Sequence, residues 1–372
     1  MDKILQRSRG KIDIEFSNNN FKKNFQSGCC KILNPNSYNK NNELVLINTA
    51  GGLTCNDKIE INALIEKSEF SICTQAAEKI YAGIGDPAKV EINITLNNSS
   101  LYWLPKELIL FNNSKLDRKI NVDLSDNNIK KFYQSGCCKI LNPKNYNEYK
   151  ELVLINTAGG ITCNDNIQIN ATINNSQLSI CTQAAEKIYA GIGDPATLEI
   201  NINLNNSTLY WLPKELILFD NSKLRRKINI KLSDNSNLIF CETSIFGRKA
   251  MSEAIKNISF SDQWNIYINS SLKHFEAINL KGSMIDNYKN NYTFANKSSL
   301  STILIFGEII HTLESELRKA TKNIENHYCE ITKFDEKIII RCIADDNYDL
   351  KKTLNYIIKN IIYDKLPKSW DL

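Results

Sequence analysis

The sequence lacks any long apolar run. No stretch approaches the roughly 18 residues that a membrane-spanning helix needs. The first residues, MDKILQRSRGKIDIEF, are charged and contain no apolar core of a secretory signal. The formal net charge is only +5, and the basic residues form no block that would attract nucleic acid. We therefore expect a cytoplasmic protein with neither a membrane nor a nucleic acid as a partner.

The sequence is also poor in groups that build catalytic or metal sites. The three histidines, His274, His311 and His327, have no partner at the spacing of a metal site or of a catalytic triad. None of the 11 cysteines forms a C-x-x-C pair, and most of them recur in a repeat. Because no signal peptide is visible, we expect reduced thiols that pack as small apolar groups. These absences favour a binding or scaffold protein over an enzyme.

What the sequence does contain is a long internal repeat. Gln26 to Asp126 match Gln134 to Asp234 without a gap at 80 of 101 positions. The string TQAAEKIYAGIGDPA occurs unchanged at residues 74–88 and 182–196. Solenoid and propeller units are shorter, roughly 20 to 50 residues, so we interpret the repeat as a duplicated half-domain. Substitutions between the copies mostly exchange apolar for apolar and polar for polar residues, which preserves the binary pattern.

The repeat divides the chain into four expected segments. They are an N-terminal strand segment (1–25), the first copy (26–133), the second copy (134–237) and a C-terminal part with strands and helices (238–372). Together they would form one domain with an extra half. Only the second copy continues directly into the C-terminal part, so its packing there costs less loop-closure entropy. We expect the first copy to be an additional layer.

Each copy carries the patterns of β-strands and turns. The run Leu44-Val45-Leu46-Ile47 is followed by the turn residues Asn48 to Gly52 and by a second alternating run around Ile59 and Ile61. Further alternating runs continue as far as residue 104. Each copy is therefore predicted to be almost entirely β.

One glycine motif, Gly83-Ile84-Gly85-Asp86-Pro87-Ala88, has the spacing of a weak dinucleotide fingerprint. Such a loop must follow a strand and open a helix whose N-terminus faces phosphate. Val90 to Leu96 alternates like a strand instead. We interpret the glycines as a turn between strands and expect no nucleotide site.

The periodicity changes near the C-terminus. Ile303 to Ile324 and Tyr348 to Ile362 carry apolar residues at helical spacing. Ile338 to Ile343 has the character of a buried strand between them. The predicted fold is therefore mainly β with two C-terminal helices.

Five motifs occur together along the chain, namely LINTAGGLTCND, TQAAEKIY, YWLPKELILF, FGRKAMSE and LPKSW. In these motifs and their order the chain resembles the urease accessory protein family UreD, also called UreH. Removing one copy of 108 residues from the 372 leaves 264, a length that suits a single family member. The resemblance implies a fold of stacked or β-helix-like sheets and no enzymatic activity.

The resemblance also implies partners and a cargo. Members act in nickel insertion into apo-urease, in a complex with the helical partner UreF and the GTPase UreG. By this resemblance, the expected partners are apo-urease subunits, a UreF-like accessory protein and UreG. Nickel would pass in transit, and no cofactor would be tightly bound.

The resemblance transfers candidate residues motif by motif. Partner-binding or polar-passage candidates are Asp57, Gln75, Lys79, Tyr81, Glu107, Asp165, Gln183, Lys187, Tyr189, Glu215, Arg248 and Glu253. Positions with a structural role are Gly51, Gly52, Trp103, Pro105, Gly159, Gly160, Trp211, Pro213 and Gly247. A charged residue inside such a motif must be paired, exposed to a partner or placed along a polar passage. The plain alternative is a backbone requirement for the glycines and core packing for the tryptophans.

The chain departs from the family at two points. Cys55 and Cys163 stand where the family usually has small residues, and a soft thiol there would be able to contact nickel in transit. The duplication leaves open which copy forms the working fold. Two other classes also stay open, a surface β-solenoid that binds a polymer and a duplicated gene product without function.

Overall fold

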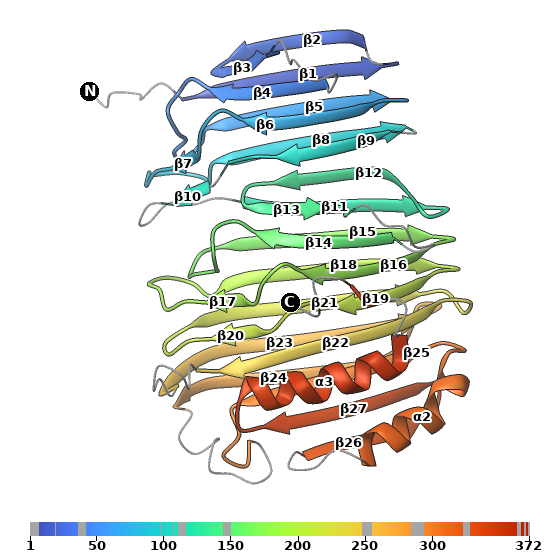
Figure 1. Ribbon diagram of the computed structural model, residues 1–372. Helices are drawn as coiled ribbons and strands as arrows, with labels where there is room; N and C mark the ends of the chain where they lie inside the picture. Colours follow the sequence, from blue (N-terminus) through green and yellow to red (C-terminus); the bar gives the residue numbers. More distant parts are fainter. Residues whose placement is uncertain are drawn as a thin grey trace.

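The computed structural model describes residues 7–18, 20–35, 42–97, 99–106, 108–110, 117–143, 150–247, 255–283, 294–322, 328–362, 366–367 and 370. Within these residues the chain is mainly β with two helices near the C-terminus, as the sequence predicts (Figure 1). The strands stack in two layers, from the N-terminal strands at one end to the helices at the other. No helix of this part of the chain is long and apolar enough to cross a membrane.

The first layer is one continuous 11-stranded sheet in the order β2-β1-β5-β8-β12-β11-β15-β18-β21-β23-β24. Its strands are β1 (Arg9–Ser17), β2 (Asn20–Gly28), β5 (Lys58–Glu66), β8 (Lys89–Asn97), β11 (Asp117–Ser125), β12 (Asn128–Ser135), β15 (Asn166–Asn174), β18 (Ala196–Asn205), β21 (Lys223–Leu232), β23 (Asn257–Ile268) and β24 (Ser271–Ser283). Strands β2, β12 and β24 run antiparallel to their neighbours. The other neighbouring pairs are parallel.

The second layer consists of separate sheets. A four-stranded sheet contains β3 (Cys30–Leu33), β4 (Asn42–Asn48), β6 (Glu69–Thr74) and β9 (Ser100–Leu104). A 10-stranded sheet contains β13 (Cys138–Leu141), β14 (Lys150–Asn156), β16 (Gln177–Thr182), β17 (Glu186–Ile188), β19 (Thr208–Leu212), β20 (Leu216–Leu218), β22 (Asn237–Phe246), β25 (Ser299–Phe306), β26 (Tyr328–Phe334) and β27 (Lys337–Ala344). The short strands β7 (Glu78–Ile80) and β10 (Leu108–Leu110) form a pair of their own.

A ladder of asparagine amides links the parallel strands of the first layer. Its members are Asn121, Asn170, Asn201, Asn229 and Asn265, and each Nδ2 donates to Oδ1 of the preceding member over 2.7 to 3.1 Å. All five occupy one register position of five adjacent strands. A slip of any one of these strands by one residue would break the bonds between its asparagine and the neighbouring members, so the amides help to fix the register.

Two strands align with β11 when the sequence is shifted by 108 residues. They are β21, later in the chain, and β1, earlier in the chain. β1 pairs with β5 from Arg9 opposite Lys58, and β11 pairs with β15 from Asp117 opposite Asn166. β11 therefore takes the place of β1 for the second copy. The hairpin partner β12 fills the position between β8 and β11. A two-residue connection makes this hairpin local, which keeps its loop-closure cost low.

This arrangement interrupts the second layer where the two copies meet. In the second copy, β19 pairs in parallel with β22, which continues the sheet into β25 and β27. The counterpart of β22 in the first copy is residues 129–138, which form most of β12 in the other layer. The four-stranded sheet consequently ends at β9, and the 10-stranded sheet begins at β13.

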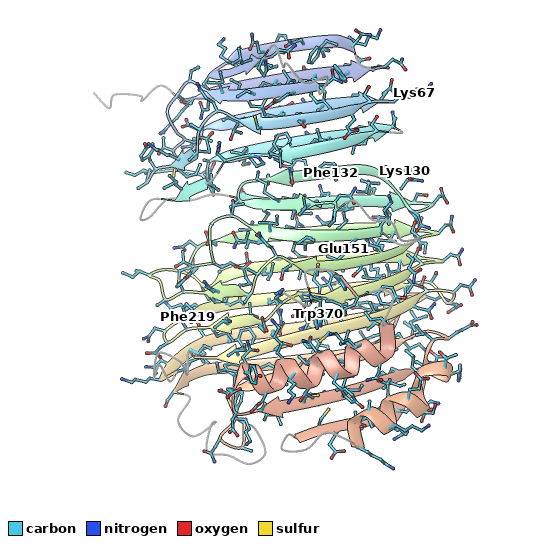
Figure 2. The ribbon with its side chains drawn as sticks, in the orientation of Figure 1. Lys67, Lys130, Phe132, Glu151, Phe219 and Trp370 are labelled. Carbon is cyan, nitrogen blue, oxygen red and sulfur yellow. The ribbon has the colours of Figure 1, made fainter. Side chains whose placement is uncertain are left out.

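Two apolar cores hold the layers together. The larger core fills the space between the layers along both copies. The smaller one lies between the 10-stranded sheet and the helices α2 (Ile310–Lys322) and α3 (Asn347–Ile362). It joins Tyr210 and Leu212 of β19 to Leu350 and Leu354 of α3. Trp370, which is labelled in Figure 2, belongs to the same core.

The first helix begins later than its apolar spacing predicts. Ile303 to Phe306, expected to be helical, are the end of β25. All four side chains are 0% exposed, because β25 pairs with β22 and β27 at its edges and packs against one apolar core on each face. A short apolar run that is buried on both faces does not distinguish a strand from a helix. The second helix and the strand between the two helices lie where they were predicted.

The outer face of the second layer is buried in the second copy and partly open in the first. Leu212 is 0% exposed, whereas its counterpart Leu104 is 57% exposed. Cys181 is buried and Cys73 is half-buried. The same side chains therefore remove less apolar area from water in the first copy, which lowers its share of the hydrophobic stabilisation.

Candidate functional site between the two layers

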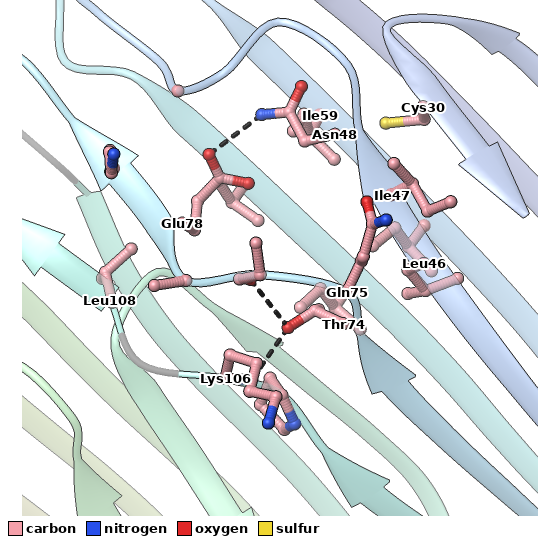
Figure 3. Close-up of a pocket in the computed structure, with 18 of the residues that line it drawn as sticks. Cys30, Leu46, Ile47, Asn48, Ile59, Thr74, Gln75, Glu78, Lys106 and Leu108 are labelled. Carbon is pink, nitrogen blue, oxygen red and sulfur yellow. Dashed lines mark hydrogen bonds between the residues drawn. The ribbon is translucent and has the colours of Figure 1, made fainter.

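Each copy contains a cavity between its two layers, of about 290 Å³ in the first copy and about 180 Å³ in the second. Equivalent residues line both: Asn48, Thr74, Gln75, Glu78, Lys79, Trp103, Pro105 and Lys106 in the first, and Asn156, Thr182, Gln183, Glu186, Lys187, Trp211, Pro213 and Lys214 in the second. Isoleucines of the first layer form an apolar wall. Figure 3 shows the first cavity.

One threonine in each copy holds two motifs together at the cavity. Thr74 Oγ1 accepts a hydrogen bond from the Lys106 amide over 2.8 Å and donates to the Ala76 carbonyl over 3.2 Å (Figure 3). Thr182 makes the same bonds to Lys214 and Ala184, at 2.9 and 3.0 Å. The motif TQAAEKIY is thus fixed against YWLPKE, which explains why both contribute to one cavity.

A carboxylate of the TQAAEKIY motif lies in each cavity. Asn48 Nδ2 donates to Glu78 Oε1 over 2.9 Å (Figure 3), and Asn156 Nδ2 donates to Glu186 Oε1 over 2.8 Å. Burial raises the pKa of Glu78, and the amide of Asn48 only partly opposes this effect. The motif therefore places a titratable oxygen ligand between the apolar wall and the polar residues of the cavity.

A buried charge network closes the second cavity. Arg226 of β21 donates from Nη1 to Glu242 Oε2 and from Nε and Nη2 to the two oxygens of Asp262, over 2.5 to 2.9 Å. Trp211 Nε1 donates to the other oxygen of Glu242 over 2.7 Å, and Trp264 Nε1 donates to Asp262 Oδ1 over 2.9 Å. The three charged residues are at most 4% exposed. Burial opposes ionisation of Arg226, but the two carboxylates outweigh it and raise the pKa of the guanidinium.

Four of the residues proposed from the motifs line these cavities. Gln75 and Lys79 lie at the first cavity, and Gln183 and Lys187 at the second. All four are exposed, so they belong to the solvent side of each cavity. The structural-motif residues that line the cavities as well are Gly51, Gly52, Trp103 and Pro105 in the first copy and Gly159, Trp211 and Pro213 in the second.

The two proposed aspartates lie in turns. Asp57 is buried and accepts hydrogen bonds from the amides of Ser8 at 2.7 Å and Thr54 at 2.8 Å. Asp165 accepts from the Thr162 amide at 2.9 Å in the equivalent turn. A carboxylate that satisfies two backbone amides stabilises the turn, which favours a structural role for Asp57.

The proposed tyrosines pack over glycines of the LINTAGG motif. Tyr81 is 39% exposed and Tyr189 is 40% exposed. A Cβ atom on Gly52 or Gly160 would collide with the neighbouring tyrosine ring. Gly52 also has a φ of 150°, which side chains rarely adopt. These glycines are therefore required by close packing and backbone conformation.

The remaining proposed residues lie apart from the two cavities or outside the described residues. Glu215 lines a small cavity of about 20 Å³ together with Lys351, Asn355 and Trp370. Gly247 follows β22 with a φ of 88°, and its amide donates to the Leu218 carbonyl. Glu107, Arg248 and Glu253 lie outside the described residues.

The thiols of TCND are packed inside the turns. Cys55 is 0% exposed and Cys163 is 7% exposed, and a Cβ atom on Gly83 or Gly191 would touch them. Burial raises the pKa of Cys163, which disfavours the thiolate that binds metals. Within the described part of the chain, no group of three or more His, Cys, Asp or Glu side chains could hold a metal ion.

Sequence reasoning missed several residues of the site. Glu78 and Glu186 stand inside a quoted motif, but their burial became visible only with the fold. Glu242 stands in the mostly apolar run LIFCETSIF, and a carboxylate within a buried strand requires a partner. That signal was available, whereas the identity of the partner, Arg226 on a strand of the other layer, was not.

Comparison with known proteins connects these motifs to one family. The family model described as UreD urease accessory protein matches residues 8–128 and again 125–366. Urease accessory protein UreD of Agrobacterium fabrum is 32% identical over 243 residues, which cover 64% of this chain and 84% of the relative. The same-named protein of Chelativorans sp. is 30% identical over 247 residues, covering 66% and 88%. The two matches of the family model overlap at residues 125–128, the turn between β11 and β12. The chain therefore belongs to the UreD family of urease accessory proteins.

Proposed function

We propose that this chain takes part in nickel insertion into apo-urease as a non-enzymatic scaffold, in a complex with a UreF-like partner and the UreG GTPase. Support comes from family membership, because the relatives are named urease accessory proteins. Nickel is the cargo in this proposal, and no residue of the chain holds it permanently.

The second copy and the C-terminal part are the proposed working body. β19 and β21 pair directly with β22 and β23 of the C-terminal part, and β11 supplies the strand beside β15. Among the described residues of 117–372, both layers are therefore continuous. The second match of the family model, 125–366, covers nearly the same residues.

The observation that carries the proposal is the polar lining of the second cavity. Glu186 and Gln183 present oxygen atoms there, and Arg226 and Glu242 close one side. No histidine is among the described residues that line this cavity. Oxygen ligands hold nickel less firmly than imidazole or thiolate, which suits an ion that must leave again.

A deletion tests which copy works. The chain without residues 26–133 would be produced in cells that make urease but lack their own UreD. Because β1 and β2 are the equivalents of β11 and β12, the join from Phe25 to Gln134 keeps a complete strand beside β15. Nickel content and activity of urease should be preserved. Removal of residues 134–241 should abolish activation, because it also removes the first half of β22.

Loss of urease activation in the first deletion, with the protein present at normal levels, would show that both copies are required.

A point variant tests whether nickel passes through the second cavity. Glu186→Gln should lower the nickel content of urease, while Glu199→Gln, the same change on an exposed position of β18, should not. Equal loss from Glu78→Gln in the first cavity would contradict the assignment of the passage to the second copy.

A further inference from the structure

The two cavities differ in one buried hydrogen-bond donor. In the second copy, Trp211 Nε1 donates to Glu242 over 2.7 Å. In the first copy, Trp103 Nε1 is buried and has no hydrogen-bond partner among the described residues. An indole N–H that is removed from water without an acceptor destabilises the fold. The first cavity therefore contains a buried donor that the described residues leave without an acceptor.

The missing acceptor is a consequence of the strand exchange between the copies. The position equivalent to Glu242, 108 residues earlier, is Gln134. It lies on β12 in the first layer, and its Oε1 accepts from the Ile140 amide of β13 over 2.9 Å. No carboxylate of β12 thus takes the place that Glu242 occupies beside Trp211.

A cation from the second copy reaches into the first cavity. Lys139 of β13 lines the cavity together with Lys79 and Lys106, whereas Glu78 is the acidic side chain among the described lining residues. Burial lowers the pKa of Lys139 to about 8, and the nearby Cys137, Cys138 and Glu78 oppose this effect without reversing it. No ion pair joins Lys139 to a described residue. The cavity is therefore short of negative charge.

The rest of the first cavity is apolar and larger than its counterpart. Ile12, Ile59, Ile61 and Ile92 of the first layer line it, and its volume is about 290 Å³ against about 180 Å³. The volume is close to the lower limit of known ligand pockets, roughly 300 Å³. The apolar wall suits an aliphatic chain, and the unpaired N–H and the buried ammonium suit an anionic group. A small amphipathic anion has both parts.

We propose that the first cavity binds a small aliphatic monocarboxylate. One carboxylate oxygen accepts from Trp103 Nε1, as Glu242 does from Trp211, and the charge is balanced by Lys139. The aliphatic chain packs against the isoleucines of the first layer. This site is separate from the passage proposed in the second copy, so either proposal can fail without the other.

The experiment is calorimetric titration of the full-length chain with hexanoate, hexan-1-ol and hexylamine. We expect saturable binding of hexanoate with one site per chain and at least tenfold weaker binding of the alcohol and the amine. Charge-assisted hydrogen bonds are about twice as strong as neutral ones, which sets the direction of this preference. Equal binding of hexanoate and hexan-1-ol would overturn the assignment, because it would mean that only the apolar wall is recognised.

Matched variants locate the site. Trp103→Phe and Lys139→Met should each weaken hexanoate binding about tenfold. Lys31→Met is the control, since Lys31 is the counterpart of Lys139 and is exposed on β3. Circular dichroism checks that each variant is folded, and the two test variants are independent of each other. Unchanged binding in either folded variant, or an equal loss in Lys31→Met, would refute the site.

Discussion

At the residue scale, the second cavity depends on a charge network that must stay complete. Arg226 balances two carboxylates, and each carboxylate also accepts from a tryptophan. Removing one charged member leaves its partners as buried charges without a counterion. The resulting loss of stability is larger than the net stabilisation by the intact network. The network therefore fixes β21, β22 and β23 relative to one another.

Replacing Arg226 by leucine should lower the free energy of unfolding by about 3–5 kcal/mol, because Glu242 and Asp262 lose their shared cation. The neighbouring Arg225 is exposed on the same strand. Its replacement by leucine should change the free energy by less than about 0.5 kcal/mol. Urea unfolding followed by circular dichroism measures both. Equal effects of the two variants would show that the ion pairs do not stabilise the fold.

The buried lysine of the first cavity should make stability depend on pH. Burial lowers the pKa of Lys139 from 10.5 to about 8, and the unfolded chain regains the higher value. Between these values the unfolded state binds more protons, so the stability of the folded state rises with pH in this window. Burial also lowers the pKa of Lys214 and Lys337, so the difference between the wild type and Lys139→Met isolates the effect.

This difference in the free energy of unfolding should shift in favour of the wild type from pH 8 to pH 10.5. Urea titrations at several pH values measure it. The control is again Lys31→Met, whose difference from the wild type should stay constant because Lys31 is exposed. A constant difference for Lys139→Met would contradict the burial of its ammonium group.

At the element scale, two strands that differ only in their first residue, β9 and β19, have different neighbours in their sheets. β19 pairs with β16 on one side and β22 on the other, while β9 is the last strand of its sheet in the described structure. Backbone amides on an open edge exchange with solvent more readily than amides within a sheet. Residues 101–110 and 209–218 are identical, so the intrinsic hydrogen-exchange rates of their amides are nearly the same. Differences in measured exchange therefore report on structure.

Hydrogen exchange should therefore be faster in β9 than in β19. Peptides that begin at Ser100 and at Thr208 differ in mass, which allows mass spectrometry to separate them. Limited proteolysis should likewise cut the first copy before the second. Slower or equal exchange in β9 would mean that another chain covers this edge in solution.

The sequence predicts the strands well because their alternation and their turn residues are local signals. It singles out Gln75, Lys79, Gln183 and Lys187 by their motifs, but only the fold places them at the same cavities as Trp103 and Trp211. It does not predict the role of β11. The sequence of residues 117–125 is most similar to that of β21, whereas in the sheet this strand takes the position that β1 has in the first copy. Loop-closure entropy and register decide which of two similar strand pairings forms. Neither can be inferred from the sequence of one strand.

At the scale of the whole molecule, the two copies are joined mainly through one continuous layer. β8 and β12 pair from Glu91 opposite Ser135 to Thr95 opposite Lys131, while the second layer is broken at this level. The C-terminal body has two complete layers and two helices, and the first copy has a partly open outer face. The stabilities of the two parts should consequently differ.

Calorimetry of the full-length chain should show two unfolding transitions, the lower one from the first copy. Deleting residues 26–133 should remove the lower transition and shift the upper midpoint by only a few degrees, because β1 and β2 replace β11 and β12 beside β15. The same deletion should remove hexanoate binding, since Trp103 is lost. A single transition in the full-length chain would show that the pairing of β8 with β12 is strong enough to make both copies unfold together. In that case the long sheet, and not each pair of layers, would be the cooperative unit.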